Sequence, residues 1–174
     1  MRPRPPRAAR KAREGAAAVE FAMVATPFLI LLYSLIELGL VFMIDAVAEN
    51  AVVDATRLIR TGQAYEEGFD AAKFKTAFCD KMSVFKNDCA ARTTVDVRVV
   101  ASFAATDEGT DADGDGVPDE DSYDGGDAED LILVRIWYRQ PMIAPSLTQA
   151  VSRGRTGEVL ITSTTAFRNE PWKA

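Results

Sequence analysis

A long apolar stretch near the N-terminus constrains this chain more than any other feature. Residues 21–36 carry no charge, and apolar residues continue past Glu37 to Ile44. The hydrocarbon core of a bilayer is roughly 30 Å thick, and a helix of about 20 mostly apolar residues can cross it. The sequence therefore predicts a transmembrane helix over residues 16–44.

Basic residues crowd the segment that precedes this helix. The first 15 residues hold six arginines and lysines against one acid, Glu14, whereas the remainder carries 14 basic and 25 acidic residues, a net charge of −11. Basic flanks of membrane helices remain in the cytoplasm. We therefore expect a single-pass protein with a cytoplasmic N-terminus and an acidic outer part. Such an outer part argues against nucleic acid as a partner.

The junction between the basic segment and the apolar helix has its own pattern. Gly15 ends the basic segment, and Glu20 lies five residues beyond it, at the head of the apolar run. A secretory signal peptide would instead have its apolar region before the cleavage site. A carboxylate in a membrane helix is costly, and less so near the bilayer edge. Glu20 is thus either an interfacial side chain that remains hydrated or a group with a dedicated partner.

The basic leader, Gly15, Glu20 and the apolar helix together resemble the prepilin peptidase site of type IV pilin-like proteins. The stretch GAAAVEFAMVATPFLILLYSLIELG, continued by NAVVDATRLIRTGQ, is similar to the TadE-like family, the minor pseudopilins of the tight-adherence (Tad/Flp) pilus. The C-terminal TSTTAFRNEP also resembles this family. The middle of the chain resembles it only in layout.

This resemblance implies that residues 1–15 are a leader peptide, cut between Gly15 and Ala16 by a membrane prepilin peptidase. It assigns Glu20 to processing and assembly, with the new amine of Ala16, in the same or an adjacent subunit, as its partner charge. The implied partners are the peptidase, other pilins or pseudopilins and inner-membrane pilus assembly proteins. The implied location is the bacterial inner membrane, with a periplasmic head, either incorporated in a surface pilus or retained at the assembly machine. The implied role is pilus assembly, and hence surface adhesion.

Two residues interrupt the apolar helix. Pro27 predicts a kink, which membrane helices tolerate, and it is either harmless or a hinge. Glu37 lies 17 residues beyond Glu20, about 25 Å further along a helix that rises 1.5 Å per residue. We expect Glu37 near the outer edge of the hydrocarbon, in an interfacial or helix-packing role.

The remaining pattern indicates an α+β protein. Apolar residues recur every three or four positions over 48–59 and Gly62 is a typical helix stop, so residues 45–62 should extend the membrane helix. A second helix is predicted over Phe69 to Met82 and a connector over Pro141 to Val151. Three runs rich in valine, isoleucine, threonine and aromatic residues predict strands: 93–104, 131–139 and 158–167. We expect residues 63–174 to form an outward head with an antiparallel sheet of about three strands packed against the long helix.

Two cysteines, Cys79 and Cys89, lie in the predicted outer part. An oxidising compartment and this short spacing favour a disulfide between them, although two free thiols are the alternative. A zinc site is disfavoured, because the chain has two cysteines and no histidine.

An acidic loop is predicted over residues 107–130, where 12 of 24 residues are aspartate or glutamate and none is basic. Within it, acids alternate as in the calcium loops of EF-hand and thrombospondin type 3 repeat proteins, and Val117 could add a backbone carbonyl. The predicted ligands are Asp111, Asp113, Asp115, Val117 and Asp119. The twelfth position, however, is Ser122 instead of glutamate. A calcium site of weak affinity and a solvated acidic loop both remain open.

Catalysis finds little support in this sequence. The chain contains no histidine, the usual general base, and it shows no phosphate-binding loop or nucleophile motif. We therefore expect no enzymatic activity. The favoured interpretation is a processed minor pseudopilin, and the alternative is an unprocessed, single-pass, calcium-binding surface adhesin or receptor.

Overall fold

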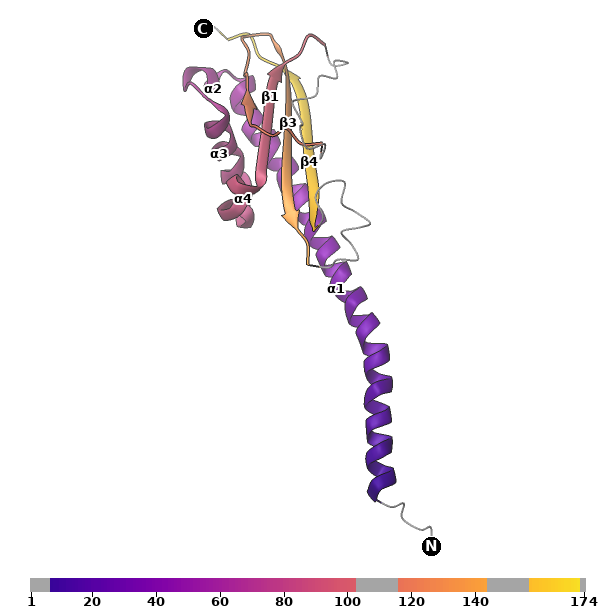
Figure 1. Cartoon of the computed structure of the whole chain (residues 1–174). Coiled ribbons are helices and arrows are strands. Elements are labelled where there is room, and N and C mark those ends of the chain that lie inside the picture. Colours follow the sequence, from indigo (N-terminus) through magenta and orange to yellow (C-terminus); the bar gives the residue numbers. More distant parts are fainter. Residues whose placement is uncertain (1–6, 103–115, 144–156, 173–174) are drawn as a thin grey trace.

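A single helix, α1 (Arg7–Arg60), dominates the shape of the molecule. The computed structural model describes residues 7–102, 116–143 and 157–172. In Figure 1, α1 projects as a stalk from a small head, and its 54 residues continue through Pro27 and past the expected leader boundary at Gly15. At 1.5 Å per residue it is about 80 Å long.

The two halves of α1 differ in what surrounds them. In residues 15–36 the side chains are exposed or partly exposed, including large apolar ones such as Phe21 and Phe28. From Glu37 onward, buried side chains recur every three or four residues along one face. This face comprises Glu37, Val41, Ile44, Ala48, Ala51, Val52, Ala55, Thr56 and Ile59. The upper half of α1 is therefore part of the core of the head, as the predicted period indicated.

Short helices follow the end of α1. Gly62 adopts φ +81°, the left-handed conformation that ends helices at glycine, and its N–H donates to the carbonyl of Ile59. Next come α2 (Gln63–Glu66) and α3 (Ala71–Lys81), where the Asp70 side chain caps α3 by accepting from the N–H of Lys73 at 2.7 Å. A 3₁₀ turn, η1 (Ser83–Phe85), and α4 (Lys86–Arg92) lead into the sheet.

The sheet has four strands in the order β2-β1-β3-β4. Its members are β1 (Thr93–Val99), β2 (Ser122–Tyr123), β3 (Leu131–Pro141) and β4 (Glu158–Arg168). The β1–β3 and β3–β4 pairs are antiparallel, and Val95 lies opposite Ile136, which lies opposite Ser163. The predicted antiparallel strands are therefore confirmed. The addition is β2, a two-residue strand that pairs in parallel with β1.

One face of the sheet packs on the helices. Helix α1 contacts β4 and β3, and α3 contacts both α1 and β1. Alternate residues of the strands enter the core, among them Val95, Val97, Val134 and Ile136, and they meet Phe74 and Phe78 of α3. The structure thus confirms an α+β fold with a long N-terminal helix. Helix α3 begins two residues later and ends one residue earlier than predicted, and β1 ends at Val99, not at Ala104.

Candidate functional site

The predicted processing segment lies in the exposed lower part of α1. Gly15, Ala16 and Glu20 are all exposed. A Cβ added at Gly15 would have no atom within 4 Å. Ala16 and Glu20 are four residues apart in one helix, so they lie on the same side about one turn from each other. An amine at residue 16 could therefore reach the carboxylate of Glu20 within one helix.

The apolar surface around this segment is extensive. The stretch Gly15–Arg60 has a mean hydropathy of 2.2 in its most apolar window, and it is the one helix among the described residues that is long and apolar enough to cross a membrane. Large side chains such as Met23, Leu31 and Ile36 are each more than half exposed. A surface of this kind needs an apolar environment, because soluble monomers rarely expose contiguous apolar patches of this size.

Glu37 marks the point where α1 enters the head. Its side chain is 8% exposed, and its carboxylate accepts a hydrogen bond from the backbone N–H of Ile143, just beyond β3. Of the two roles expected for Glu37, the structure therefore supports packing within the protein. The carboxylate thus connects α1 to the segment that follows the C-terminal end of β3.

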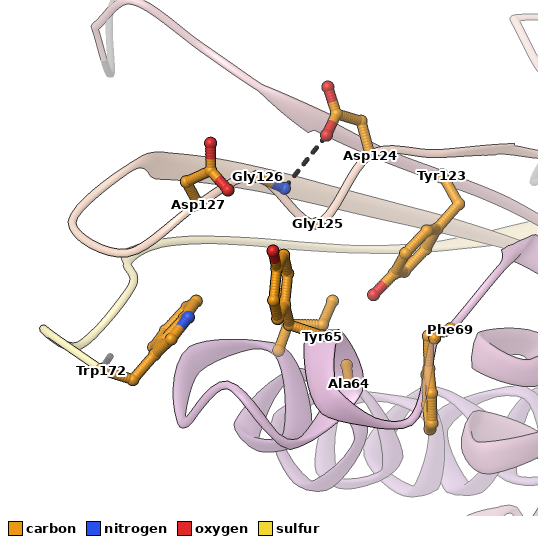
Figure 2. Close-up of a pocket in the computed structure, with 11 residues that line it drawn as sticks. Ala64, Tyr65, Phe69, Tyr123, Asp124, Gly125, Gly126, Asp127 and Trp172 are labelled. Carbon is orange, nitrogen blue, oxygen red and sulfur yellow. Dashed lines mark hydrogen bonds between the residues drawn. The ribbon is translucent and has the colours of Figure 1, made fainter. Parts of the chain in front are cut away.

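A cavity of about 440 Å³ lies at the other end of the head. This distal cavity lies between the end of α1, the segment around α2, the loop 124–127 after β2, and the C-terminal segment. Figure 2 shows the rings of Trp172 and Tyr65 below the loop of Asp124 to Asp127, whereas the ring of Tyr123 extends from the loop side towards Phe69. This cavity could not be predicted from the sequence, because its aromatic residues are scattered singly along the chain.

Burial and neighbouring charge act together on Tyr123 in this cavity. Burial first, and then the carboxylates of Asp124 and Asp70, raise the pKa of the Tyr123 hydroxyl to about 12. The hydroxyl is therefore protonated at neutral pH and can donate a hydrogen bond. Its ring also packs on Phe74 of α3, with 5.8 Å between the ring centroids.

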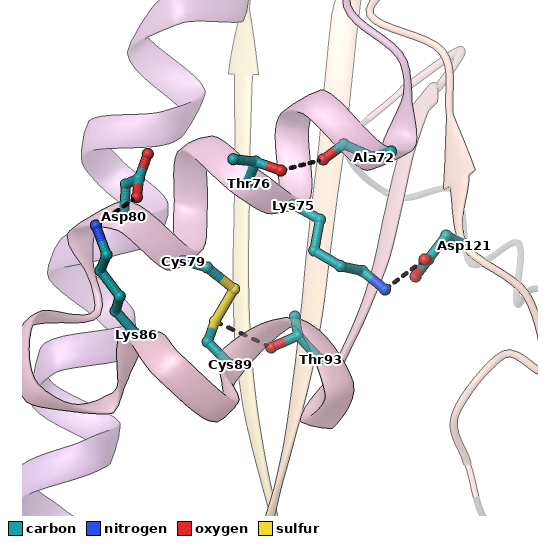
Figure 3. The surroundings of a disulfide bond; sticks show 9 residues. All are labelled: Ala72, Lys75, Thr76, Cys79, Asp80, Lys86, Cys89, Thr93 and Asp121. Atoms are coloured by element: carbon teal, nitrogen blue, oxygen red, sulfur yellow. Dashed lines mark hydrogen bonds and ion pairs between the residues drawn. A yellow bond between two sulfur atoms is a disulfide. The ribbon is translucent and has the colours of Figure 1, made fainter.

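The two cysteines are joined as predicted. A disulfide links Cys79 in α3 to Cys89 in α4, with 5.6 Å between the Cα atoms. Figure 3 shows the bond between the two helices, with the Cys89 sulfur 3.5 Å from the hydroxyl of Thr93 at the start of β1. The bond therefore fixes α4 on α3 where the chain enters the sheet.

Most of the predicted calcium ligands lie outside the described residues. Asp111, Asp113 and Asp115 lie outside the described residues. Of the other two predicted ligands, Val117 has a buried side chain and Asp119 is exposed. Over the described ranges, no three histidine, cysteine, aspartate or glutamate side chains gather as a metal site would require. Calcium binding therefore stays a sequence-based prediction.

The second half of the predicted acidic loop is built into the fold instead of being merely solvated. Asp121 accepts from the N–H of Val95 at 2.9 Å and forms an ion pair with Lys75 of α3 (Figure 3). Asp130 accepts from the N–H of Asp127 at 2.8 Å. These carboxylates satisfy backbone donors in β1 and in the turn before β3, a role that composition alone did not reveal.

A buried carboxylate in β1 was also missed by sequence reasoning. Asp96 is fully buried, 2.7 Å from a guanidinium nitrogen of Arg98 and 3.3 Å from one of Arg135. The hydroxyl of Ser122 donates to it at 2.5 Å, which helps to hold β2 against β1. An alternation of Asp96 with Arg98 in a strand was the available signal, but the pairing with Arg135 depends on the β1–β3 register.

Comparisons with known proteins bear on the long helix alone. No curated protein and no solved structure matches the chain. Residues 15–57 match the sequence model of the TadE-like proteins. The matched segment begins at the glycine of the predicted cleavage site and runs through the exposed part of α1 into the head. Over residues 15–57, therefore, this chain is similar to the TadE-like proteins, which confirms the expected resemblance for that segment.

Proposed function

We propose that this protein is a non-enzymatic minor pseudopilin that is cut after Gly15 and takes part in assembly of a Tad/Flp pilus. The observation that carries the proposal is the family match over residues 15–57, which coincides with one continuous helix. In this proposal α1 spans the bacterial inner membrane, its N-terminus is cytoplasmic, and the head lies in the periplasm. Its partners are a prepilin peptidase, other pilins or pseudopilins, and the inner-membrane assembly proteins.

The exposed apolar half of α1 supports a role that depends on neighbours. Among the described residues, the large apolar side chains over residues 19–36 are 43–74% exposed. A bilayer can cover them before assembly, and the helices of other subunits can cover them afterwards. The same apolar surface thus contacts lipid before assembly and other subunits afterwards. The head packs on residues 37–59 of the same helix, so it moves together with this surface.

Glu20 is the group that distinguishes assembly from simple membrane anchoring. Cleavage would create a charged amine at Ala16, one helical turn from the Glu20 carboxylate. An unpaired carboxylate in the apolar region is unfavourable, so an amine from the same or an adjacent subunit stabilises it. We expect this pair to set the register of the subunit in the assembly.

Mass spectrometry of the mature N-terminus tests the processing step. In cells with an active pilus system we expect the chain to begin at Ala16, and Gly15→Val should leave the precursor uncut, because the peptidase must approach the backbone there. Gly39→Val is the matched control: Gly39 lies in the same helix, and its added Cβ would also meet nothing within 4 Å. A mature chain that retains Met1 would refute processing and favour the unprocessed adhesin.

Crosslinking of Glu20→Ala tests the assembly step. This variant should still insert in the membrane and be cut, but it should not crosslink into pilus complexes. Glu49→Ala removes an exposed carboxylate from the upper half of α1 and should assemble normally. Native-level crosslinking of Glu20→Ala would show that the carboxylate has no part in assembly.

A further inference from the structure

The distal cavity has the chemistry of a site for a cation. We propose that it binds the side chain of an arginine or lysine presented by a partner peptide. The cavity belongs to the head, at the end opposite the exposed half of α1 (Figure 1). This proposal goes beyond the proposed function, and its test does not depend on cleavage or on pilus entry.

Aromatic rings from separate segments supply the first part of the site. Tyr65 lies in α2 and Phe69 follows it, Tyr123 ends β2, and Trp172 comes from the C-terminal segment. The faces of such rings carry partial negative charge and attract ammonium and guanidinium groups within about 6 Å of the centroid. Tyr65 is 52% exposed, although aromatic residues usually bury their rings. A side chain entering the cavity would cover this ring.

The charges around the cavity favour a positively charged ligand. Asp124 and Asp127 line it, and none of its described lining residues is basic. The ammonium of nearby Lys73 donates to the backbone carbonyls of Glu67 at 2.9 Å and Gly68 at 3.0 Å. Burial is the largest cause of the raised pKa of Tyr123, and the carboxylates of Asp124 and Asp70 raise this pKa further, as a negative potential does.

The walls of the cavity are held in place without a ligand. The side-chain amide of Asn169, a buried residue, donates to the carbonyls of Gly125 and Asp127, each at 2.9 Å. The loop is further fixed by the N–H of Asp124, which donates to Val97 at 2.8 Å. A preformed site avoids the entropic cost of ordering its walls upon binding.

The Trp172 wall is fixed by the end of α1. Trp172 packs on Gly62, where an added Cβ would lie 2.7 Å from the indole ring. The N–H of Glu170 donates to the carbonyl of Arg60 at 2.9 Å, which fixes the C-terminal segment against the helix. The volume of about 440 Å³ falls in the range of sites for small ligands. One long side chain fits such a space, whereas a folded element does not.

Nuclear magnetic resonance on the full-length chain in detergent micelles tests the proposal. The two tryptophans give two indole N–H signals, and Trp137, which lies in β3 and is 5% exposed, is an internal reference for Trp172. The probes are the acetylated amides of arginine and lysine, with the citrulline derivative as the neutral isostere of arginine. We expect the cationic probes to shift the Trp172 signal saturably, and the citrulline probe to leave it in place.

Two variants assign the binding to the cavity. Tyr65→Ala removes one ring and Asp127→Asn removes one charge, and each should weaken binding of the arginine probe by about 3- to 30-fold. Glu49→Gln makes the same charge change as Asp127→Asn at an exposed position on α1, outside the cavity, and should leave the affinity unchanged. Equal shifts with the arginine and citrulline probes, or no shift of the Trp172 signal with either cationic probe, would each overturn the proposal.

Discussion

The carboxylate of Glu37 accepts a hydrogen bond from the backbone N–H of Ile143, which lies 106 residues further along the chain. Glu37 interrupts the apolar run of α1 and is nevertheless buried, and Ile143 lies just beyond the end of β3. The contact joins the helix to the end of the head that faces the exposed half of α1. It therefore fixes the place at which α1 leaves the head.

Replacing Glu37 tests this contact. Glu37→Leu leaves the N–H of Ile143 without this acceptor. Ile143 is 75% exposed, so water can reach this N–H and the loss should be near the net worth of one hydrogen bond, about 0.5–1.5 kcal/mol. Glu37→Gln retains an acceptor oxygen and should lose less. Urea unfolding of the full chain in micelles measures both. Equal free energies of unfolding of the two variants would show that an acceptor oxygen at residue 37 does not stabilise the fold.

The pair of Gly62 and Trp172 gives a second prediction. Gly62→Ala places a Cβ in a left-handed conformation and against the indole, so it should lower the free energy of unfolding by more than the roughly 1 kcal/mol of the backbone effect alone. Gly68→Ala is the matched control, because Gly68 has φ +58° with nothing within 4 Å of an added Cβ. If thermal unfolding shows that Gly62→Ala and Gly68→Ala lower the stability equally, the indole of Trp172 moves aside without a cost in free energy.

Alkaline pH should weaken the fold through Tyr123. Its pKa is about 12 in the folded protein and 10.0 in the reference state, so folding favours the protonated hydroxyl. The stabilisation is complete below pH 10 and is lost as the pH rises from 10 to about 12. Tyr123→Phe should reduce the fall of the urea-unfolding midpoint between pH 10 and about 12. The control is Tyr65→Phe, which removes a hydroxyl from a more exposed tyrosine in the same cavity. An unchanged pH profile in Tyr123→Phe would contradict the prediction.

Reduction of the Cys79–Cys89 disulfide should lower the free energy of unfolding by about 2–3 kcal/mol, because so short a loop restricts the unfolded chain only modestly. Unfolding with and without reductant measures this difference. The double variant Cys79→Ala/Cys89→Ala should be insensitive to reductant. Alkylation of both thiols in folded, unreduced protein would show that the bond does not form in solution.

Calcium binding is testable by calorimetry on the full chain. The alternating acids from Asp111 to Asp119 predict weak, roughly millimolar affinity. Asp113→Asn combined with Asp115→Asn should abolish most of the binding heat, whereas Asp127→Asn, outside the motif, should preserve it. Absence of heat with millimolar calcium would leave the solvated acidic loop as the interpretation of this segment.

Periodicity explains which parts of the fold were predictable. The buried face of α1 and the alternation in β3 and β4 follow from apolar residues at fixed intervals. The strand β2 did not follow, because two residues in an acidic segment carry no period, and it is held by tertiary contacts. One is the N–H of Asp124 donating to Val97, and another is Ser122 donating to Asp96.

Candidate sites divide in the same way. The disulfide between the two cysteines could be predicted from their spacing, whereas the roles of Gly15 and Glu20 stay predictions from the family resemblance. The distal cavity could not, because Tyr65, Tyr123 and Trp172 are far apart in sequence and meet only when α2, the 124–127 loop and the C-terminus come together. The roles of Asp121 and Asp130 were also hidden, since composition cannot distinguish a solvated acid from one that accepts a backbone hydrogen bond.

The course of α1 has a mechanical consequence. Strands β3 and β4 run lengthwise beside its upper half (Figure 1), and α1 packs on both. A pull along the helix therefore loads the strands in shear, where the ladder from Leu131 opposite Arg168 to Pro141 opposite Glu158 must yield together. A pull across the sheet would instead unzip one pair at a time. Axial tension is thus the direction in which this head resists force best.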